Sequence, residues 1–318
     1  MMTIFPPPPI RPGETIGIIA PAGQLQEPRL FASGVRILKE MGFAVRFPRD
    51  LWSGCSYLAD SDENRSREFN QLVGDPQVKA LLALRGGYGC LRMLGGIDMA
   101  LFARQPKMVV GFSDITVLQN YLYAQTGVIS LHGPVLTSLE GATQAALERF
   151  YRALTGGWRE RIASSEIEIL QDAPTVHAPL VGGNLASLLT LLGTPYDSSW
   201  RGKIVFLEDT SEAPYRLDRM LTQLWLAGKF DGIKGLILGD FSNGTGTAQA
   251  DEQRCRETVW QRMMEIAGNL SVPIWGNFPS GHCPGNLTLP LGAVAEMAQG
   301  STSLTFAFTK GDAGGDDV

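Results

Sequence analysis

A strand-like run stops at a glycine in the stretch Val109-Val110-Gly111-Phe112-Ser113-Asp114, and a helical pattern of apolar residues begins directly after it. Such a strand–turn–helix junction exposes the serine hydroxyl at a helix N-terminus, where free N–H groups and the helix dipole stabilise negative charge. An ordinary turn in which Ser113 or Asp114 caps the helix has the same sequence pattern. The stretch therefore predicts either a nucleophile elbow at Ser113 or a simple helix cap.

Strand-like and helix-like segments alternate through the first half of the chain. Because this alternation implies right-handed crossovers, it predicts a parallel sheet, and such sheets bind ligands beyond the carboxyl ends of their strands. Pro21-Ala22-Gly23, Gly86-Gly87 and Ser113 all follow predicted strands. The predicted strands cover residues 15–20, 43–47, 78–84, 108–110 and 128–131, with helices around 30–41, 65–73, 91–94 and 115–126.

The second half is more mixed, and 318 residues are enough for two domains. We expect an N-terminal α/β domain over residues 1–157, a polar linker over 158–178 and a C-terminal domain over 179–310. The glycine- and aspartate-rich residues 311–318 predict a disordered tail. In the C-terminal domain we predict helices around 185–192, 215–227 and 253–266 and strands around 204–207, 235–239, 272–275, 287–291 and 303–308.

The composition favours an enzyme of the cytoplasm over several other classes of protein. A net charge of −5 argues against nucleic acid as a partner. No run of about 18 or more apolar residues predicts a membrane span, and the N-terminal residues lack the pattern of an export signal. The four cysteines form no C-x-x-C pair and the three histidines are dispersed. We therefore expect no metal, no cofactor and no membrane or nucleic-acid partner.

A serine nucleophile needs a base that takes its proton, and the chain offers three histidines for that role. His132 follows a predicted buried strand, and His177 lies in the predicted linker. His282 lies in the turn-rich loop Pro279–Pro284, and a loop residue on a rigid scaffold is the better catalytic candidate. For each histidine, a purely structural role is the alternative.

The base in turn needs a carboxylate that orients it. Glu208 ends the apolar strand predicted at 204–207, so we expect it at the mouth of that strand. Asp209 and Glu212 lie close by in the sequence, and Glu212 is a second candidate for the same role. The alternative is that Glu208 or Asp209 caps the helix that begins near Pro214.

Three glycines in four residues follow the predicted strand at 78–84, in Arg85-Gly86-Gly87-Tyr88-Gly89. Glycine lets a backbone approach a ligand closely. The segment lacks the G-x-G-x-x-G order and the Lys-Ser/Thr pair of nucleotide-binding loops. It predicts a phosphate cradle, a plain tight turn, or an oxyanion hole in which the N–H groups of Gly87 and Asp114 act together.

Five motifs in a fixed order resemble those of the LD-carboxypeptidase family of serine peptidases, and the resemblance extends from about Thr15 to Phe308. One branch of this family acts on cell-wall tetrapeptides, and another gives immunity to microcin C. The motifs are Arg85-Gly86-Gly87-Tyr88-Gly89, Gly111-Phe112-Ser113-Asp114, Gly182-Gly183-Asn184-Leu185 with Gly193-Thr194-Pro195, Leu207-Glu208-Asp209 with Arg219-Met220-Leu221, and Gly281-His282.

The resemblance implies a catalytic triad of Ser113, Glu208 and His282, and an oxyanion hole formed by the backbone N–H groups of Gly87 and Asp114. It implies an α/β fold with a flavodoxin- or glutamine-amidotransferase-like parallel-sheet domain, followed by a β-rich mixed domain. It also implies a homodimer that needs no metal. The candidate substrate-binding residues are Arg85, Asn184 and Glu212.

The function that follows is hydrolysis of the amide between the L-centre of a diamino acid and a terminal D-alanine, in the recycling of cell-wall tetrapeptides. The muropeptide would be its partner. A peptidase for a peptidyl-nucleotide antibiotic is an alternative, although no long insertion between Pro195 and Glu208 supplies a nucleotide-recognition loop. In a third interpretation, from a different class, the chain is a non-catalytic protein in which Arg85 and Asn184 grip the carboxylate of a small ligand.

Overall fold

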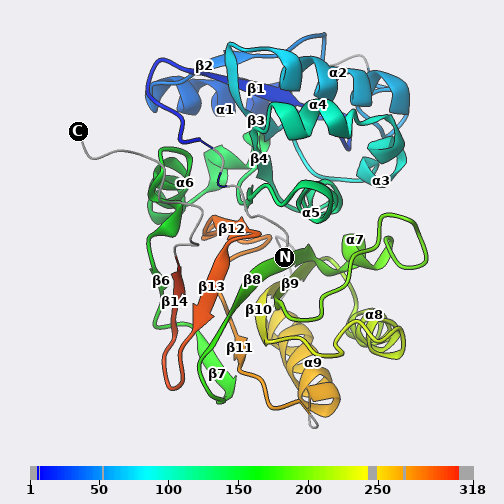
Figure 1. Cartoon of the computed structure of the whole chain (residues 1–318), viewed down its shortest axis with the longest axis vertical. Helices are drawn as coiled ribbons and strands as arrows, with labels where there is room; N and C mark the ends of the chain where they lie inside the picture. The colour runs from blue at the N-terminus through cyan, green and yellow to red at the C-terminus, as the bar shows by residue number, and fades with distance from the viewer. Residues whose placement is uncertain (1–5, 7, 52–53, 243–248, 268–269, 308–318) are drawn as a thin grey trace. The chain divides into compact units, whose positions relative to one another are not determined.

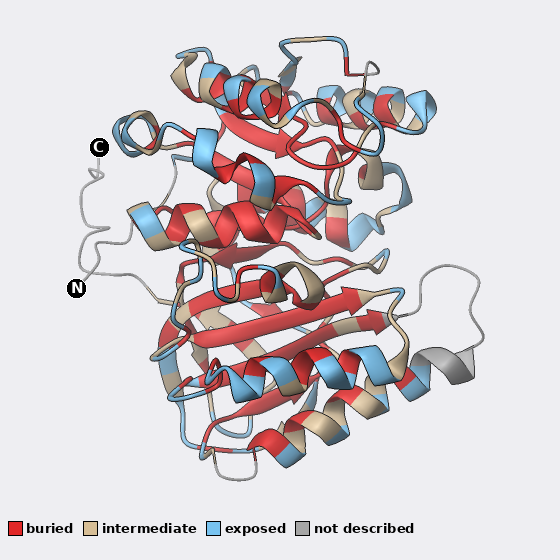
Figure 2. Ribbon diagram, turned by 90° about the vertical axis from the view of Figure 1, so that its right-hand side faces the viewer, coloured by how far each residue is buried: buried red, intermediate tan, exposed pale blue. Residues whose placement is uncertain are grey.

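The computed structural model describes residues 6, 8–51, 54–242, 249–267 and 270–307. The chain divides into two compact units. Unit 1 comprises Met1–Trp158 with Leu287–Pro290, and unit 2 comprises Arg159–Asn286 with Leu291–Val318. In both units the strands supply much of the buried hydrophobic core. Figure 2 shows buried residues running along the strands, whereas most helices have one buried and one exposed face.

Unit 1 is an α/β unit whose six-stranded sheet has the order β12-β5-β4-β3-β1-β2 (Figure 1). All pairs from β5 to β2 are parallel, as the alternating pattern predicts. The strands are β1 (Thr15–Ile19), β2 (Ala44–Arg46), β3 (Val78–Ala83), β4 (Met108–Gly111), β5 (Ser130–His132) and β12 (Leu289–Leu291). The helices are α1 (Pro28–Glu40), α2 (Asp62–Gly74), α3 (Cys90–Met93), α4 (Met99–Arg104), α5 (Ile115–Thr126) and α6 (Gln144–Leu154), with short 3₁₀ helices at Leu94–Gly96, Leu136–Gly141 and Gly157–Arg159.

Local sequence signals account for the ends of these helices. The Ser61 hydroxyl accepts a hydrogen bond from the Asn64 N–H at 3.2 Å and so caps the start of α2. Helix α5 begins at Ile115 and ends at Thr126 as predicted, and Gly127 closes it in the left-handed conformation with φ 74°. Helix α2 packs on β1 and β3, and α5 packs on β4 and β5. The helices thus cover the sheet whose strand ends carry the predicted loops.

Unit 2 contains a mixed eight-stranded sheet with the order β6-β14-β13-β8-β9-β10-β11-β7. Strands β8 to β11 are parallel and the outer pairs are antiparallel. Helices α8 and α9 lie side by side, and α9 packs on β10 (Figure 1). The strands are β6 (Ile162–Ala163), β7 (Glu168–Gln171), β8 (Val176–Asn184), β9 (Ile204–Thr210), β10 (Gly235–Ser242), β11 (Ile274–Gly276), β13 (Val294–Met297) and β14 (Ser303–Phe306), and the helices are α7 (Leu185–Leu189), α8 (Pro214–Leu226) and α9 (Gln249–Ala267).

The segment 158–178 differs from the predicted linker. It contributes β6, β7 and the start of β8 to the sheet of unit 2. Among its charged and polar residues lie buried apolar side chains, including those of Ile162 and Ile167. Edge strands of this length alternate too briefly to be recognised from their sequence.

The strand near 287–291 was expected in the C-terminal domain, but β12 belongs to the sheet of unit 1, in which it neighbours β5. A short apolar run predicts a buried strand without saying which sheet receives it. Strand β13 was not predicted at all. The predicted disordered tail, 311–318, lies outside the described residues.

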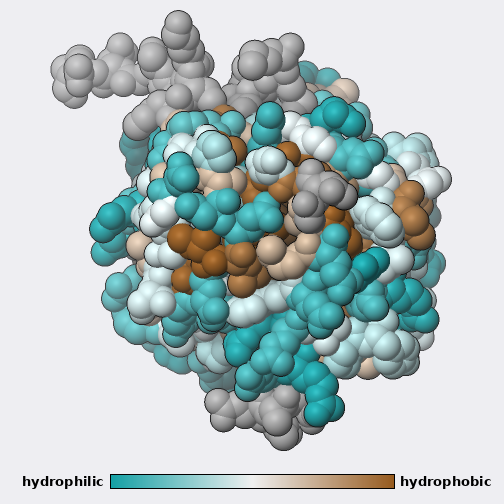
Figure 3. Space-filling model, turned by 90° about the horizontal axis from the view of Figure 1, so that it is seen from below, coloured by the Kyte–Doolittle hydropathy of each residue, from teal (hydrophilic) through white to brown (hydrophobic). Residues whose placement is uncertain are grey.

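Hydrophilic residues cover much of the face that Figure 3 draws. Figure 3 shows one face on which a group of hydrophobic residues is surrounded by hydrophilic ones. Exposed large apolar side chains include Tyr215, Trp225 and Leu226 of α8. No helix within the described parts of the chain is both long enough and apolar enough to span a membrane.

Candidate active site

Ser113 lies in unit 1, between the end of β4 and the start of α5, with its backbone in the left-handed region at φ 64°. This conformation is uncommon for a residue other than glycine, and such strain gathers at functional sites. A nucleophile elbow holds its serine in such a strained conformation, so the positive φ of Ser113 favours the elbow over the simple cap. The capping alternative is not supported, because Asp114 occupies the N-cap position of α5 without a capping hydrogen bond from its side chain.

The glycine-rich loop that follows β3 packs directly against Ser113. A Cβ atom placed on Gly86 would lie 2.7 Å from both Cβ and Oγ of Ser113, so only glycine allows this approach. The Gly86 carbonyl accepts a hydrogen bond from the Gly23 N–H at 3.1 Å, which ties the loop to the segment after β1. The three strand ends singled out in the sequence therefore meet at one edge of this sheet.

Arg85, a candidate substrate-binding residue, is half-buried in the same loop. Its guanidinium donates from Nη1 to the Gln24 carbonyl at 2.9 Å, and burial lowers its pKa. The guanidinium therefore already serves as a brace between two loops of unit 1.

In unit 2, the structure brings Glu208 and His282 together. Nδ1 of His282 lies 2.7 Å from Oε2 of Glu208, whose side chain is completely buried near the carboxyl end of β9. His282 follows Gly281, where an added Cβ would lie 3.0 Å from Oε2 of Glu208. The Asn286 side chain closes the loop, since its Oδ1 accepts from the Ser280 hydroxyl and the Gly281 N–H, each at 3.1 Å. The predicted carboxylate and histidine thus form one pair.

The surroundings of His282 favour its protonated form. Burial alone would lower the pKa of the imidazole. The charge and hydrogen bond of Glu208, with smaller effects of Asp209 and Asp240, outweigh burial and raise the pKa above the ordinary 6.5. Because an ionised carboxylate can only accept, Nδ1 donates to Glu208 and Nε2 is left to accept a proton.

Asp240 is a residue that the sequence reasoning missed. It follows the predicted strand at 235–239 and takes part in β10, and its Cβ would lie 3.1 Å from a Cβ placed on Gly281. Its N–H donates to the Ser280 carbonyl at 3.0 Å, next to the His282 loop. An acidic residue directly after an apolar strand, which singled out Glu208, is the signal that could have found it.

Asn184 and Asp209 form a buried network beside Glu208. Oδ1 of Asn184 accepts from the Ser187 N–H at 3.0 Å, and its Nδ2 donates to Asp209 at 3.3 Å. Oδ2 of Asp209 accepts from the Ala186 N–H at 2.8 Å. Burial first, and then the charge of Glu208, raises the pKa of Asp209 to about 7. Both polar ends of the Asn184 side chain are thus engaged by protein groups.

The remaining candidates have more ordinary surroundings. Oε2 of Glu212 lies 3.6 Å from the Arg216 guanidinium, one turn further along the chain. His132 is completely buried at the end of β5, with its ring edge-on to Phe112. His177 is half-exposed on β8 and lies 2.5 Å from its antiparallel neighbour Glu296. Among the three histidines, His282 alone combines a loop position with a buried carboxylate.

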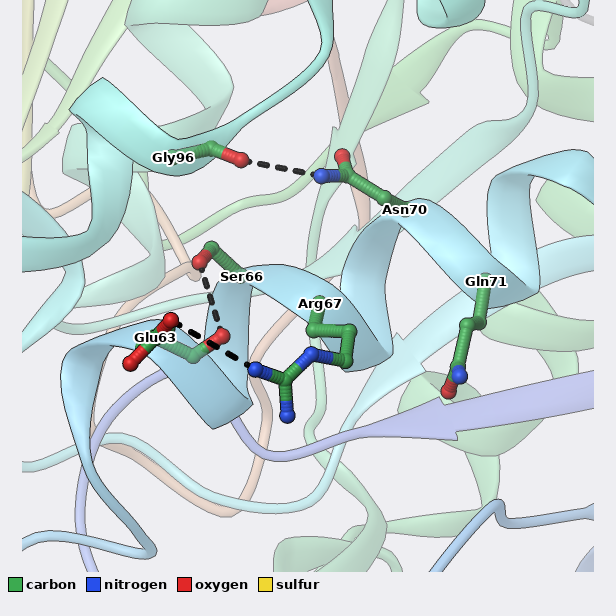
Figure 4. A pocket seen from close by; sticks show the side chains of 6 residues that line it. All are labelled: Glu63, Ser66, Arg67, Asn70, Gln71 and Gly96. Carbon is green, nitrogen blue, oxygen red and sulfur yellow. Dashed lines mark hydrogen bonds and ion pairs between the residues drawn. The ribbon is translucent and has the colours of Figure 1, made fainter.

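In the part of the chain that the structure describes, neither a metal cluster nor the cavity on α2 adds chemistry to this site. Within the described residues, no group of three or more histidine, cysteine, aspartate or glutamate side chains could hold a metal ion. A cavity of about 480 Å³ lies on α2, and Figure 4 shows several of its polar side chains bonded to neighbours, for instance Asn70 to the Gly96 carbonyl at 2.9 Å. None of the predicted site residues lines it; its lining is Glu63, Ser66, Arg67, Asn70, Gln71 and Gly96.

Comparison with known proteins assigns both halves of the chain to one family. Residues 16–133 match the LD-carboxypeptidase N-terminal domain and residues 177–297 the LD-carboxypeptidase C-terminal domain. A probable murein peptide carboxypeptidase from Bacillus subtilis is 32% identical, covering 92% of this chain and 91% of its own length. The crystal structure of muramoyltetrapeptide carboxypeptidase from Oxalobacter formigenes has a TM-score of 0.76 at 30% identity, covering 92% of this chain and 97% of its own. The microcin self-immunity protein MccF from Escherichia coli is 26% identical, covering 89% and 90%.

Proposed function

Because the chain belongs to the LD-carboxypeptidase family, we propose that it is a serine peptidase that releases terminal D-alanine from cell-wall tetrapeptides. The bond broken joins the L-centre of a diamino acid, meso-diaminopimelate or lysine, to D-alanine. The observation that carries the proposal is the left-handed Ser113 at the strand–helix turn, packed against a glycine-rich loop. The similarity to carboxypeptidases of murein peptides supports the substrate class.

The mechanism follows from the roles of five residues. Ser113 attacks the scissile carbonyl carbon while Nε2 of His282 takes the hydroxyl proton, and Glu208 holds the imidazole through Nδ1. The N–H groups of Gly87 and Asp114 bind the oxyanion that forms. His282 then gives the proton to the nitrogen of the departing D-alanine, and water, activated by the same imidazole, hydrolyses the acyl-enzyme.

Substrate recognition is a further part of the proposal. Arg85, Asn184 and Glu212 are the candidates for contacts with the peptide, although in the free protein each has a partner within its own unit. On the family resemblance, we also propose that the enzyme acts in the cytoplasm as a homodimer, without a metal or other cofactor.

A second candidate substrate is a peptidyl-nucleotide, because MccF is among the relatives. The connection between α7, which ends at Leu189, and β9, which begins at Ile204, holds no long insertion that could enclose a nucleoside. This short connection favours the tetrapeptide.

The proposal is tested by offering both substrates to the purified protein. We expect D-alanine release from a muropeptide tetrapeptide, unchanged by EDTA, with a higher kcat/KM than cleavage of an aminoacyl sulfamoyl nucleoside. Mass spectrometry after treatment with a fluorophosphonate should place the label on Ser113. A higher kcat/KM for the nucleoside would identify a peptidyl-nucleotide as the substrate, and the serine mechanism would still stand. Absence of both turnover and label would favour the non-catalytic binding protein.

A further inference from the structure

The Asp114 side chain lies at the start of α5, but it bonds to a different loop and does not cap the helix. The carboxylate is buried, 5% exposed, and Oδ2 accepts a hydrogen bond from the Cys90 N–H at 2.8 Å. Cys90 begins α3 directly after the glycine-rich loop, 24 residues away in the chain. The bond therefore ties the turn that carries Ser113 to the end of the loop that carries Gly87.

Arg65 of α2 also bonds to the glycine-rich loop. Its side chain is completely buried, and Nη1 donates to the Gly89 carbonyl at 2.9 Å and to the Pro21 carbonyl. Nε donates to the Asp60 carbonyl at 3.1 Å. A guanidinium is planar and rigid, so its simultaneous bonds fix the relative positions of the carbonyls that it contacts. Arg65 thus joins the loop after β3 to the segment after β1.

The other end of the loop is held as well. The Gly23 N–H donates to the Gly86 carbonyl, and Arg85 donates to the Gln24 carbonyl. Gly87 therefore lies between fixed points at residues 86 and 89. All these contacts belong to unit 1.

Keeping the Asp114 carboxylate in this place is unfavourable in itself. Burial raises its pKa, while the hydrogen bond from Cys90 and the charge of Arg65 oppose that rise. A buried carboxylate is costly unless hydrogen bonds satisfy it. The Asp114 side chain does not cap the helix, and the bond from the Cys90 N–H is the contact that satisfies its buried Oδ2.

We propose that the Asp114 carboxylate and the Arg65 guanidinium are positioning groups that hold the Gly87 N–H and the Asp114 N–H at the separation needed to bind one oxyanion. The inference rests on the proposed function, which assigns those two N–H groups to the oxyanion. Donors must lie within about 2.7–3.1 Å of the oxyanion to stabilise it. Releasing the loop should therefore weaken binding of the transition state more than binding of the substrate.

The test compares Asp114→Ala, Asp114→Asn and Arg65→Lys with Arg149→Lys. Arg149 is a matched control, because it is also a buried arginine of unit 1 that donates to three backbone carbonyls, those of Thr288, Gly157 and Trp158. We expect Asp114→Ala and Arg65→Lys to lower kcat by about 10- to 100-fold with little change in KM. The Asn variant keeps an acceptor for the Cys90 N–H and should recover most of the loss. Arg149→Lys should leave kcat near that of the wild type.

Amide hydrogen exchange gives a readout that does not require turnover. Residues 87–90 should exchange faster in Asp114→Ala than in the wild type, and Asp114→Asn should restore their protection. Unchanged exchange and unchanged kcat in a folded Asp114→Ala protein would overturn the proposal, as would equal losses in Arg149→Lys. If the wild type releases no D-alanine, the proposed function fails, while the exchange comparison still decides the role of Asp114.

Discussion

At the scale of single residues, the proposed chemistry depends on how the buried carboxylates around His282 divide their roles. Glu208 bonds Nδ1 directly, whereas Asp209 is held by backbone N–H groups and by Asn184. Both carboxylates raise the pKa of the imidazole. The sequence identified Glu208 from its place after an apolar strand, and it could not reveal that its neighbour is buried in a separate network.

Activity should therefore depend on pH through His282. Only the neutral imidazole accepts the serine proton, and its folded pKa is raised above 6.5. We expect kcat/KM to fall as the pH drops through an apparent pKa above 6.5. Glu208→Gln removes the strongest cause of the rise, so the acid limb should move to lower pH while kcat falls by about 10³- to 10⁴-fold. An acid limb at the same pH in the two proteins would contradict the assigned pair.

Asp209 makes a prediction about stability. The pKa of Asp209 is about 7 in the folded protein, whereas the ordinary aspartate value of 3.8 applies to the unfolded state. Between these two pH values the unfolded state therefore binds fewer protons than the folded state. Its contribution to stability is present below pH 3.8 and is lost as the pH rises towards 7. Asp209→Asn cannot ionise, so its Tm relative to the wild type should increase from pH 4 to pH 7. Thermal unfolding across this range measures the difference, and a constant difference would refute the buried, titrating carboxyl.

At the scale of elements, the alternation of apolar patterns predicted β1, β3, β4 and α5 closely, because each combines a long enough pattern with a clear stop signal. Strands β6 and β7 were missed because two to four residues carry too little pattern. The strand–turn–helix reading of residues 109–115 succeeded for a physical reason. The strand ends at a glycine and the helix begins at Ile115, so the chain must turn sharply between them. Ser113 lies in that turn and takes up the strained conformation.

The contact between the glycine-rich loop and Ser113 can be tested by Gly86→Ala. The new methyl group would overlap Oγ of Ser113, so the serine or the loop must move and kcat should fall. Gly141→Ala is the control, because an added Cβ there meets nothing within 4 Å and the residue belongs to the same unit. The kcat and the Tm of both variants are measured beside those of the wild type. A kcat of Gly86→Ala equal to that of the wild type would show that this packing is irrelevant to catalysis.

At the scale of the whole molecule, the proposed machinery is divided between the two units. Unit 1 carries Ser113 and both proposed oxyanion donors, and unit 2 carries Glu208 and His282. The N-terminal family match lies in unit 1, and the C-terminal match lies in unit 2 except for residues 287–290. The order of the motifs along the chain was enough to recognise this division. The return of residues 287–290 to unit 1 was not predictable, because local pattern does not encode which sheet a strand joins.

The most direct test of the account is the rate at which Ser113→Ala releases D-alanine from a tetrapeptide, measured beside its affinity for the same peptide. The substitution removes the attacking hydroxyl and leaves the rest of the site in place. We expect kcat to fall by on the order of a millionfold, while the Kd for the peptide stays near that of the wild type. Turnover by Ser113→Ala at a rate close to that of the wild type would contradict the serine mechanism.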